Sequence, residues 1–141
     1  MKSKIVFHDL KMEILDDATT VARYYGELMY VIYEAPWCWL HFVDKTQYRV
    51  EVTLQYMMDN LPPAFVQCNR SVLLNLCYYR EVDYILLMVR MDDGKEFNLA
   101  RRRMKAFKET KNNLRRISPP CPSCYVCTHK ECESRVTFCK R

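Results

Sequence analysis

Only one stretch with helical spacing stands between strand-like stretches before residue 101, and this limits the folds open to the chain. Thr53 is a favourable N-cap residue, and Pro62-Pro63 would end a helix that starts there. The apolar residues between them recur at helical spacing: Leu54, Met57, Met58 and Leu61. Parallel strands need a long crossover between each pair, usually a helix. The sequence therefore predicts a mainly antiparallel β protein with a short helix at 54–61.

Most other stretches before residue 101 are rich in Val, Ile, Tyr and Phe, which favour strands. We expect strands over residues 28–33, 39–43, 48–52, 65–68, 72–76, 82–91 and 96–99. Polar turns at 44–46, 69–71 and 92–94 separate several of them. Residues 1–11 alternate weakly, as a leading strand would, and residues 12–27 suggest a turn followed by the start of a strand.

Residues 101–116 concentrate positive charge. They contain eight basic residues and one acid, a net charge of +7, whereas the whole chain carries +5. Met104, Phe107, Lys111 and Leu114 recur every three or four residues, which predicts a basic helix with one thin apolar stripe. Such a helix is either a solvated surface or a contact for a polyanion such as nucleic acid. Charge alone leaves both interpretations open.

Glycine content excludes two classes of nucleotide enzyme. Both Gly-rich phosphate loops need closely spaced glycines, and the chain has only Gly26 and Gly94. The longest uncharged apolar run, Tyr84–Val89, is far shorter than the roughly 20 residues of a membrane helix. Asp9 follows the N-terminus too closely for a signal-peptide core. We therefore expect a cytoplasmic protein, whose cysteines are reduced thiols or metal ligands.

Three stretches together resemble the LytTR DNA-binding domain of bacterial transcription regulators. The first is Glu34-Ala35 followed by an aromatic hairpin. The second, and the most specific, is Leu61-Pro-Pro-Ala-Phe-Val-Gln-Cys-Asn-Arg-Ser-Val-Leu-Leu-Asn75. The third is Asp93-Gly94-Lys-Glu-Phe-Asn-Leu-Ala-Arg-Arg-Arg-Met-Lys105. The resemblance covers about residues 28–115, with residues 1–27 compatible as leading strands.

The resemblance implies an elongated, mostly antiparallel β domain that reads successive major grooves of DNA through loops. It also implies where the base-reading side chains lie, because the family uses three places: the hairpin after Glu-Ala, the polar turn before the Ser, and the start of the last helix. The DNA-binding residues expected on this basis are Trp37, Cys38, Asn69, Arg70, Ser71, Arg101, Arg102 and Lys105. In the family this domain is usually the output domain of a response regulator.

The sequence departs from the family pattern in each of these places. Asn69 replaces a usual His, Ala100 replaces a frequent Ser, and the first loop has Pro36-Trp37-Cys38-Trp39 where small or polar residues are common. The target DNA sequence therefore cannot be carried over.

Several of these residues have an alternative role. Arginine matches guanine O6 and N7, so Arg70, Arg101 and Arg102 are candidates for base or phosphate contacts, or are simply solvated. Asn69 could bind adenine or cap its own turn. Trp37 and Trp39 share one face of a strand and either pack in the core or, for Trp37, touch DNA.

The segment after Pro120 is rich in cysteine. Its candidate ligands are Cys121, Cys124, Cys127, His129, Cys132 and Cys139. Two overlapping C-x-x-C pairs could hold a zinc ion, although the spacing differs from standard zinc knuckles. Disorder with free thiols, redox sensing and an iron–sulfur cluster are the alternatives. The metal is left unassigned.

These observations lead to one main expectation and one alternative. We expect residues 1–117 to form a LytTR-like domain of a sequence-specific, double-stranded DNA-binding transcription regulator, with residues 118–141 as a separate Cys-rich tail. No Ser-His-acid spacing suggests a nucleophile, so neither an enzyme nor a cofactor is expected. A dimer on repeated DNA sites is compatible with the family. The alternative is a metal- or redox-responsive protein-interaction module acting through the tail.

Overall fold

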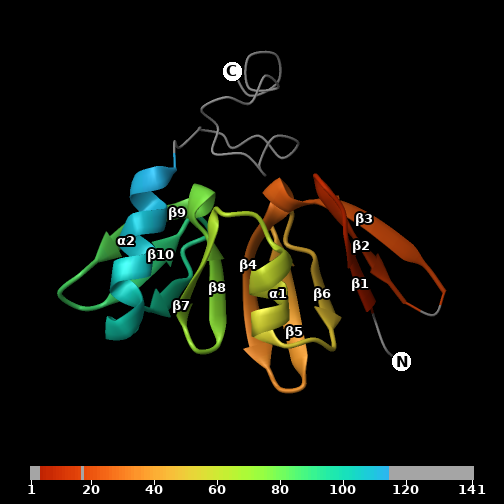
Figure 1. Cartoon of the computed structure of the whole chain (residues 1–141), viewed down its shortest axis with the longest axis horizontal. Helices are drawn as coiled ribbons and strands as arrows, with labels where there is room; N and C mark the ends of the chain where they lie inside the picture. Colours follow the sequence, from red (N-terminus) through yellow and green to blue (C-terminus); the bar gives the residue numbers. More distant parts are fainter. Residues whose placement is uncertain (1–3, 17, 115–141) are drawn as a thin grey trace, which may run out of the picture.

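The computed structural model describes residues 4–16 and 18–114, which form three antiparallel sheets side by side along the long axis of the molecule (Figure 1). The first sheet has the order β1-β2-β3: β1 (Lys4–Phe7), β2 (Lys11–Leu15) and β3 (Thr20–Tyr24). The central sheet has the order β6-β5-β4-β8-β7: β4 (Leu28–Glu34), β5 (Trp37–Phe42), β6 (Gln47–Val50), β7 (Phe65–Asn69) and β8 (Val72–Asn75). The third has the order β11-β10-β9: β9 (Tyr79–Asp83), β10 (Met88–Met91) and β11 (Glu96–Asn98).

Two α-helices and three 3-10 turns complete the described chain. They are η1 (Tyr25–Glu27), α1 (Leu54–Asn60), η2 (Leu76–Tyr78), η3 (Arg101–Arg103) and α2 (Met104–Asn113). The predicted class, a mostly antiparallel β domain with two short helices, is confirmed. No helix in this part of the chain is both long and apolar enough to cross a membrane.

Helix α1 covers one face of the central sheet (Figure 1). The Thr53 hydroxyl accepts a hydrogen bond from Tyr56 N at 3.0 Å, so Thr53 caps the helix as its residue type predicts. Leu54 and Met57 are buried on the side that faces the sheet. Pro62 and Pro63 lie just beyond the helix, as the sequence indicated.

A buried asparagine joins the central sheet to the third sheet. Asn75 has no exposed surface, and its Nδ2 donates to Leu28 O at 2.7 Å. Its Oδ1 accepts from Cys77 N at 2.9 Å and so caps η2. The nitrogen and the oxygen of the buried amide therefore each have a hydrogen-bond partner, which offsets the cost of burying them. Asn75 therefore fixes the corner where β8 turns toward β9.

The N-terminal sheet corrects the prediction for residues 12–27. This region holds two strands, β2 and β3, that pair over five positions, rather than a turn and a strand start. Arg23 fastens the sheet to the β5–β6 hairpin. Its guanidinium donates to Glu27 at 3.1 Å, Thr46 at 2.8 Å and Asp44 at 3.1 Å, and lies 4.1 Å from the centre of the Phe42 ring.

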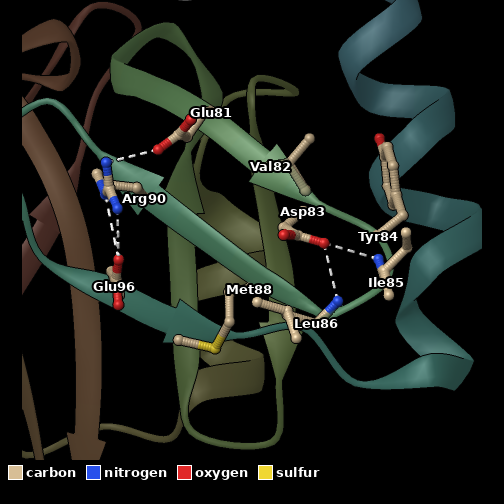
Figure 2. A pocket seen from close by; sticks show the side chains of 9 residues that line it. All are labelled: Glu81, Val82, Asp83, Tyr84, Ile85, Leu86, Met88, Arg90 and Glu96. Atoms are coloured by element: carbon tan, nitrogen blue, oxygen red, sulfur yellow. Dashed lines mark hydrogen bonds and ion pairs between the residues drawn. The ribbon is translucent and has the colours of Figure 1, made fainter.

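The prediction of one long strand over residues 82–91 is wrong. This stretch is a hairpin in which β9 and β10 pair across a turn at residues 84–87 (Figure 2). Asp83 Oδ1 accepts from Ile85 N at 2.9 Å and from Leu86 N at 2.8 Å, and Leu87 has a φ of 57°. The carboxylate thus stabilises a turn made of mostly apolar residues. One of them, Ile85, is 92% exposed.

Helix α2 packs against β7 at the other end of the molecule (Figure 1). Phe107 is fully buried, and Met104 and Leu114 are half-buried against the core, which confirms the thin apolar stripe. Lys108 Nζ lies 4.7 Å from the centre of the Tyr84 ring, so this part of the basic face contacts the third sheet.

Candidate functional site

Three turns that are distant in sequence lie next to one another at one edge of the molecule. Tyr33 N donates to Ser71 O at 2.7 Å, which joins the end of β4 to the β7–β8 turn. Ala100 N donates to Cys68 O at 2.9 Å, which joins the residue before η3 to β7. Figure 1 shows the β4–β5 turn, the β7–β8 turn and the start of α2 along the lower side of the molecule. We call residues 34–37, 69–71 and 100–105 the loop edge.

Asn69 shapes the β7–β8 turn. Its Oδ1 accepts from Ser71 N at 2.9 Å, and its Nδ2 donates to Asn98 O at 2.8 Å. Both groups of the amide are therefore engaged within the protein, and the second bond ties the turn to β11. In the structure Asn69 caps its own turn, which is one of the two roles considered for it.

Arg70 projects from the tip that Asn69 holds. Its side chain is exposed and makes no hydrogen bond or ion pair with any residue that the structure describes. Ser71, next to it, is half-buried, and its backbone carbonyl is used by Tyr33. The turn therefore presents a free guanidinium on a backbone that is fixed on both sides.

The start of α2 combines cations with an uncapped helix end. Arg101, Arg102 and Lys105 are exposed, and none has a hydrogen-bond or ion-pair partner within residues 4–16 and 18–114. Neither Ala100, before η3, nor Arg103, before α2, provides a side-chain cap, and the first turn holds no acid. Cations at the positive end of a helix cost about 0.3–1 kcal/mol each at exposed sites. The arrangement favours a bound anion, which would offset this cost.

Trp37 and Trp39 lie on the face of β5 opposite to the core. Cys38, Leu40 and Phe42 are buried on the other face, whereas the two tryptophans are half-buried outside the core cluster. The alternative in which both rings pack in the core is therefore not what the structure shows. Trp37 is the first residue of β5 after the turn, so its ring lies at the loop edge.

Cys38 differs from the other expected contact residues. Its side chain has no exposed surface, and Sγ donates to Val52 O at 3.3 Å. Burial raises the pKa of the Cys38 thiol to about 12, so the group is neutral and poorly nucleophilic at physiological pH. A buried thiol on the α1 side of the sheet cannot enter a DNA groove, because strand alternation points it away from Trp37. We leave Cys38 out of the candidate contacts.

Sequence reasoning missed one residue beside the loop edge. Arg49 lies on the edge strand β6, opposite Trp39, and its guanidinium carbon is 4.2 Å from the centre of the Trp37 ring. The signal was present in the predicted hairpin. A turn at 44–46 brings Arg49 opposite the tryptophan pair. The contact can be predicted only if the pairing register of the two strands is known.

The described residues contain no group of three or more His, Cys, Asp or Glu side chains that could hold a metal. The Cys-rich segment, with Cys121, Cys124, Cys127, His129, Cys132 and Cys139, lies outside the described residues. The zinc and redox predictions for it therefore stay predictions.

Comparison with known proteins agrees with this geometry. A family model described as the LytTr DNA-binding domain matches residues 27–112, which include all three turns of the loop edge. Among solved structures, the chain is similar to the LytTr DNA-binding domain of a protein from Bacillus cereus described as a methyl-accepting/DNA response regulator. The match has a TM-score of 0.63 and 15% identity, and covers 73% of this chain and 97% of the other, so it bears on the fold. No curated protein matches the sequence.

Proposed function

The chain belongs to the LytTR family of DNA-binding domains, and from this premise we propose that it regulates transcription by reading specific sequences of double-stranded DNA through its loop edge. The family is defined by DNA binding rather than catalysis, so we propose no enzymatic activity. We also propose the bacterial cytoplasm as its location, because a transcription regulator acts there.

The observation that carries the proposal is the convergence of free cations on one edge. Arg70 from the β7–β8 turn and Arg101 and Arg102 from the start of α2 are exposed and unpaired within the described part of the chain. The hydrogen bonds from Asn69 to Asn98 and from Ala100 to Cys68 hold the two turns together. A surface with several fixed, unneutralised arginines suits a polyanion, and the guanidinium fork suits guanine in the major groove.

The proposed roles follow from exposure and position. Arg70 and Arg102 make base contacts, because each projects from a turn that can enter a groove. Arg101 and Lys105 contact phosphates beside the uncapped helix start. The Ser71 hydroxyl supports the turn or contacts a phosphate, and Trp37 contacts sugar or a thymine methyl at the β4–β5 turn. Asn69 acts through the shape of the turn.

Selection of bound duplexes from a random pool tests the proposal directly. We expect the full chain to enrich one short motif, with binding lost when the motif is scrambled at constant composition. A pool that shows no enrichment after several rounds, at low salt, would contradict sequence-specific reading. Footprinting on the enriched duplex then reports whether the major groove is protected, and whether one or two chains occupy repeated motifs.

The Cys-rich tail supports a second candidate, a metal- or redox-responsive module. Its support is the Cys121-x-x-Cys124-x-x-Cys127 pattern, which could supply thiolate ligands from one turn of chain. We propose residues 1–117 as the DNA-binding domain and residues 118–141 as a separate tail. Salt-dependent DNA binding by a chain shortened to residues 1–117 would favour the first candidate over the second.

A further inference from the structure

Arg49 is the one arginine of the described strands that has no acidic partner. Arg23 is paired with Glu27 and Asp44, Arg80 with Asp92, and Arg90 with Glu81 and Glu96. Figure 2 shows how two carboxylates hold Arg90 from either side in the third sheet. Arg49 makes no hydrogen bond or ion pair with a described residue, although Glu51 lies two residues further along the chain, just after β6. Its charge is therefore not neutralised by contact.

Two aromatic rings, rather than an acid, hold the Arg49 side chain in place. Its guanidinium carbon lies 4.2 Å from the centre of the Trp37 ring and 5.8 Å from the centre of the Trp39 ring. A guanidinium over an indole face is attracted by the ring quadrupole, by about 0.5–1 kcal/mol at an exposed site. Stacking uses the flat face of the guanidinium and leaves the N–H groups at its rim free to donate.

The Arg49 side chain extends toward the loop edge. The residue directly opposite it across the β5–β6 ladder is Trp39. The guanidinium nevertheless lies closer to Trp37, the diagonal neighbour that is nearer to the β4–β5 turn. The side chain therefore extends along the sheet toward the loop edge, and places an exposed, unpaired cation beside the first of its three turns.

We propose that Arg49, held in place by Trp37, binds a phosphate of the DNA backbone next to the β4–β5 turn. This inference rests on the proposed function and extends the loop edge to a fourth segment, strand β6. Trp37 is then a positioning residue for Arg49. We assign a phosphate rather than a base because Arg49 projects from a strand beside the turns and not from a turn tip that could enter a groove.

The experiment measures binding of the full chain to two duplexes, the one enriched from the random pool and its scrambled form, across a series of salt concentrations. The variants are Arg49→Ala, Arg49→Lys, Trp37→Leu, Trp37→Phe and the double variant of Arg49→Ala with Trp37→Leu. Lys11→Ala, an exposed cation in the N-terminal sheet with no side-chain partner within the described residues, is the control for loss of one charge. Thermal melts check that each variant is folded.

We expect Arg49→Ala to weaken binding to both duplexes by a similar factor, about 5- to 10-fold at moderate salt. The slope of log K against log salt should fall in magnitude by about 1, as loss of one phosphate contact requires. Trp37→Leu should weaken binding more in the wild-type background than in the Arg49→Ala background, where only the contact of Trp37 itself is lost, while Trp37→Phe and Arg49→Lys retain part of the affinity. Lys11→Ala should bind like wild type.

Three results would overturn the inference. Arg49→Ala could bind both duplexes as well as wild type, or lose affinity for the enriched duplex alone, which would indicate base reading. Additive effects of Arg49→Ala and Trp37→Leu would remove the positioning role of Trp37. Failure of the wild type to bind either duplex would instead contradict the proposed function itself, so the two failures are distinguishable.

Discussion

At the residue scale, the two arginines proposed to contact bases, Arg70 and Arg102, test the interface most directly. Arg70→Ala and Arg102→Ala should each weaken binding to the enriched duplex by about 1–3 kcal/mol, because each removes a guanidinium that we propose binds a base in bidentate fashion. Both side chains are exposed and unpaired among the described residues, so the melting temperature should hardly change. Titrations of labelled duplex, with melts of each variant, measure both quantities.

Lys111→Ala is the matched control for these variants. Lys111 lies farther along the same basic helix, and its Nζ is 5.8 Å from the centre of the Tyr84 ring and 6.0 Å from that of Tyr79. Its removal should weaken binding to all sequences slightly and equally, if at all. Binding by Arg70→Ala or Arg102→Ala that equals wild type would contradict the assignment of these two residues.

Asn69 should behave as a structural residue. Asn69→Ala removes the bonds to Ser71 N and Asn98 O, and should lower the free energy of unfolding by about 1–2 kcal/mol. Asn69→Asp keeps an acceptor for Ser71 N and should recover part of that loss. Urea denaturation of the three proteins measures the difference. A stable Asn69→Ala variant that has changed its preferred motif would instead indicate a base contact.

At the scale of elements, the turns and the helix start that a polar residue marks were predicted correctly, whereas the turn within residues 82–91 and the β2–β3 pair within residues 12–27 were missed. The hairpin around Asp44, the helix capped by Thr53 and the turn at Asn69 were all visible in the sequence. The run from Val82 to Met91 was read as one strand because its turn consists of Tyr84, Ile85, Leu86 and Leu87. Asp83, which caps that turn, lies just before it, and its effect depends on backbone geometry that periodicity does not report.

The same limit applies to the candidate site. The resemblance located the three turns, but not which side chains are free. The hydrogen bond from Cys38 reaches Val52, between β6 and α1, and a bond from Asn69 reaches Asn98 in β11, so both depend on contacts distant in sequence. Arg49 could be identified as a candidate only from the β5–β6 register, which places it opposite Trp39.

The attachment of the N-terminal sheet should respond to acid. The Thr46 hydroxyl and backbone N–H, together with Arg23, hold the pKa of Asp44 down to about 2. Because the folded-state pKa lies below the ordinary value of 3.8, this carboxylate stabilises the fold above that value. The stabilisation should be lost as pH falls from about 4 toward 2.

Comparison of the wild type with Asp44→Asn isolates this effect from other acids. In urea denaturation at successive pH values, the wild type should be the more stable protein at pH 6. The two curves should converge between about pH 4 and pH 2. Parallel curves over that interval would show that Asp44 does not contribute through its charge.

At the scale of the whole molecule, affinity for DNA should depend strongly on salt. If the cations of the loop edge and helix α2 neutralise roughly 5–7 phosphates, log K should fall with log salt at a slope of about −4 to −6. Titrations of one duplex at several salt concentrations give the slope. A slope near zero would contradict the electrostatic basis of the proposed interface.

The alternative function makes its own prediction for the full chain. A zinc site within residues 121–139 would give about one metal ion per chain in the reduced protein, by elemental analysis. Because thiolates must be deprotonated to bind, the metal should leave as pH falls. Metal that persists after deletion of residues 118–141 would place the site elsewhere. A metal-free full chain whose thiols titrate freely would contradict the zinc prediction.

The burial of the cysteines in the described part of the chain has a consequence for oxidative signalling. Cys38, Cys68 and Cys77 are all buried, and burial also raises the pKa of Cys68 to about 12. Peroxide and disulfides react with exposed thiolates, so these three thiols are shielded from sulfenic acid formation while the domain is folded. The other cysteines of the chain are Cys121, Cys124, Cys127, Cys132 and Cys139. Any change in DNA affinity caused by thiol oxidation of the native protein must therefore begin in the tail and be transmitted to the loop edge that we propose reads DNA.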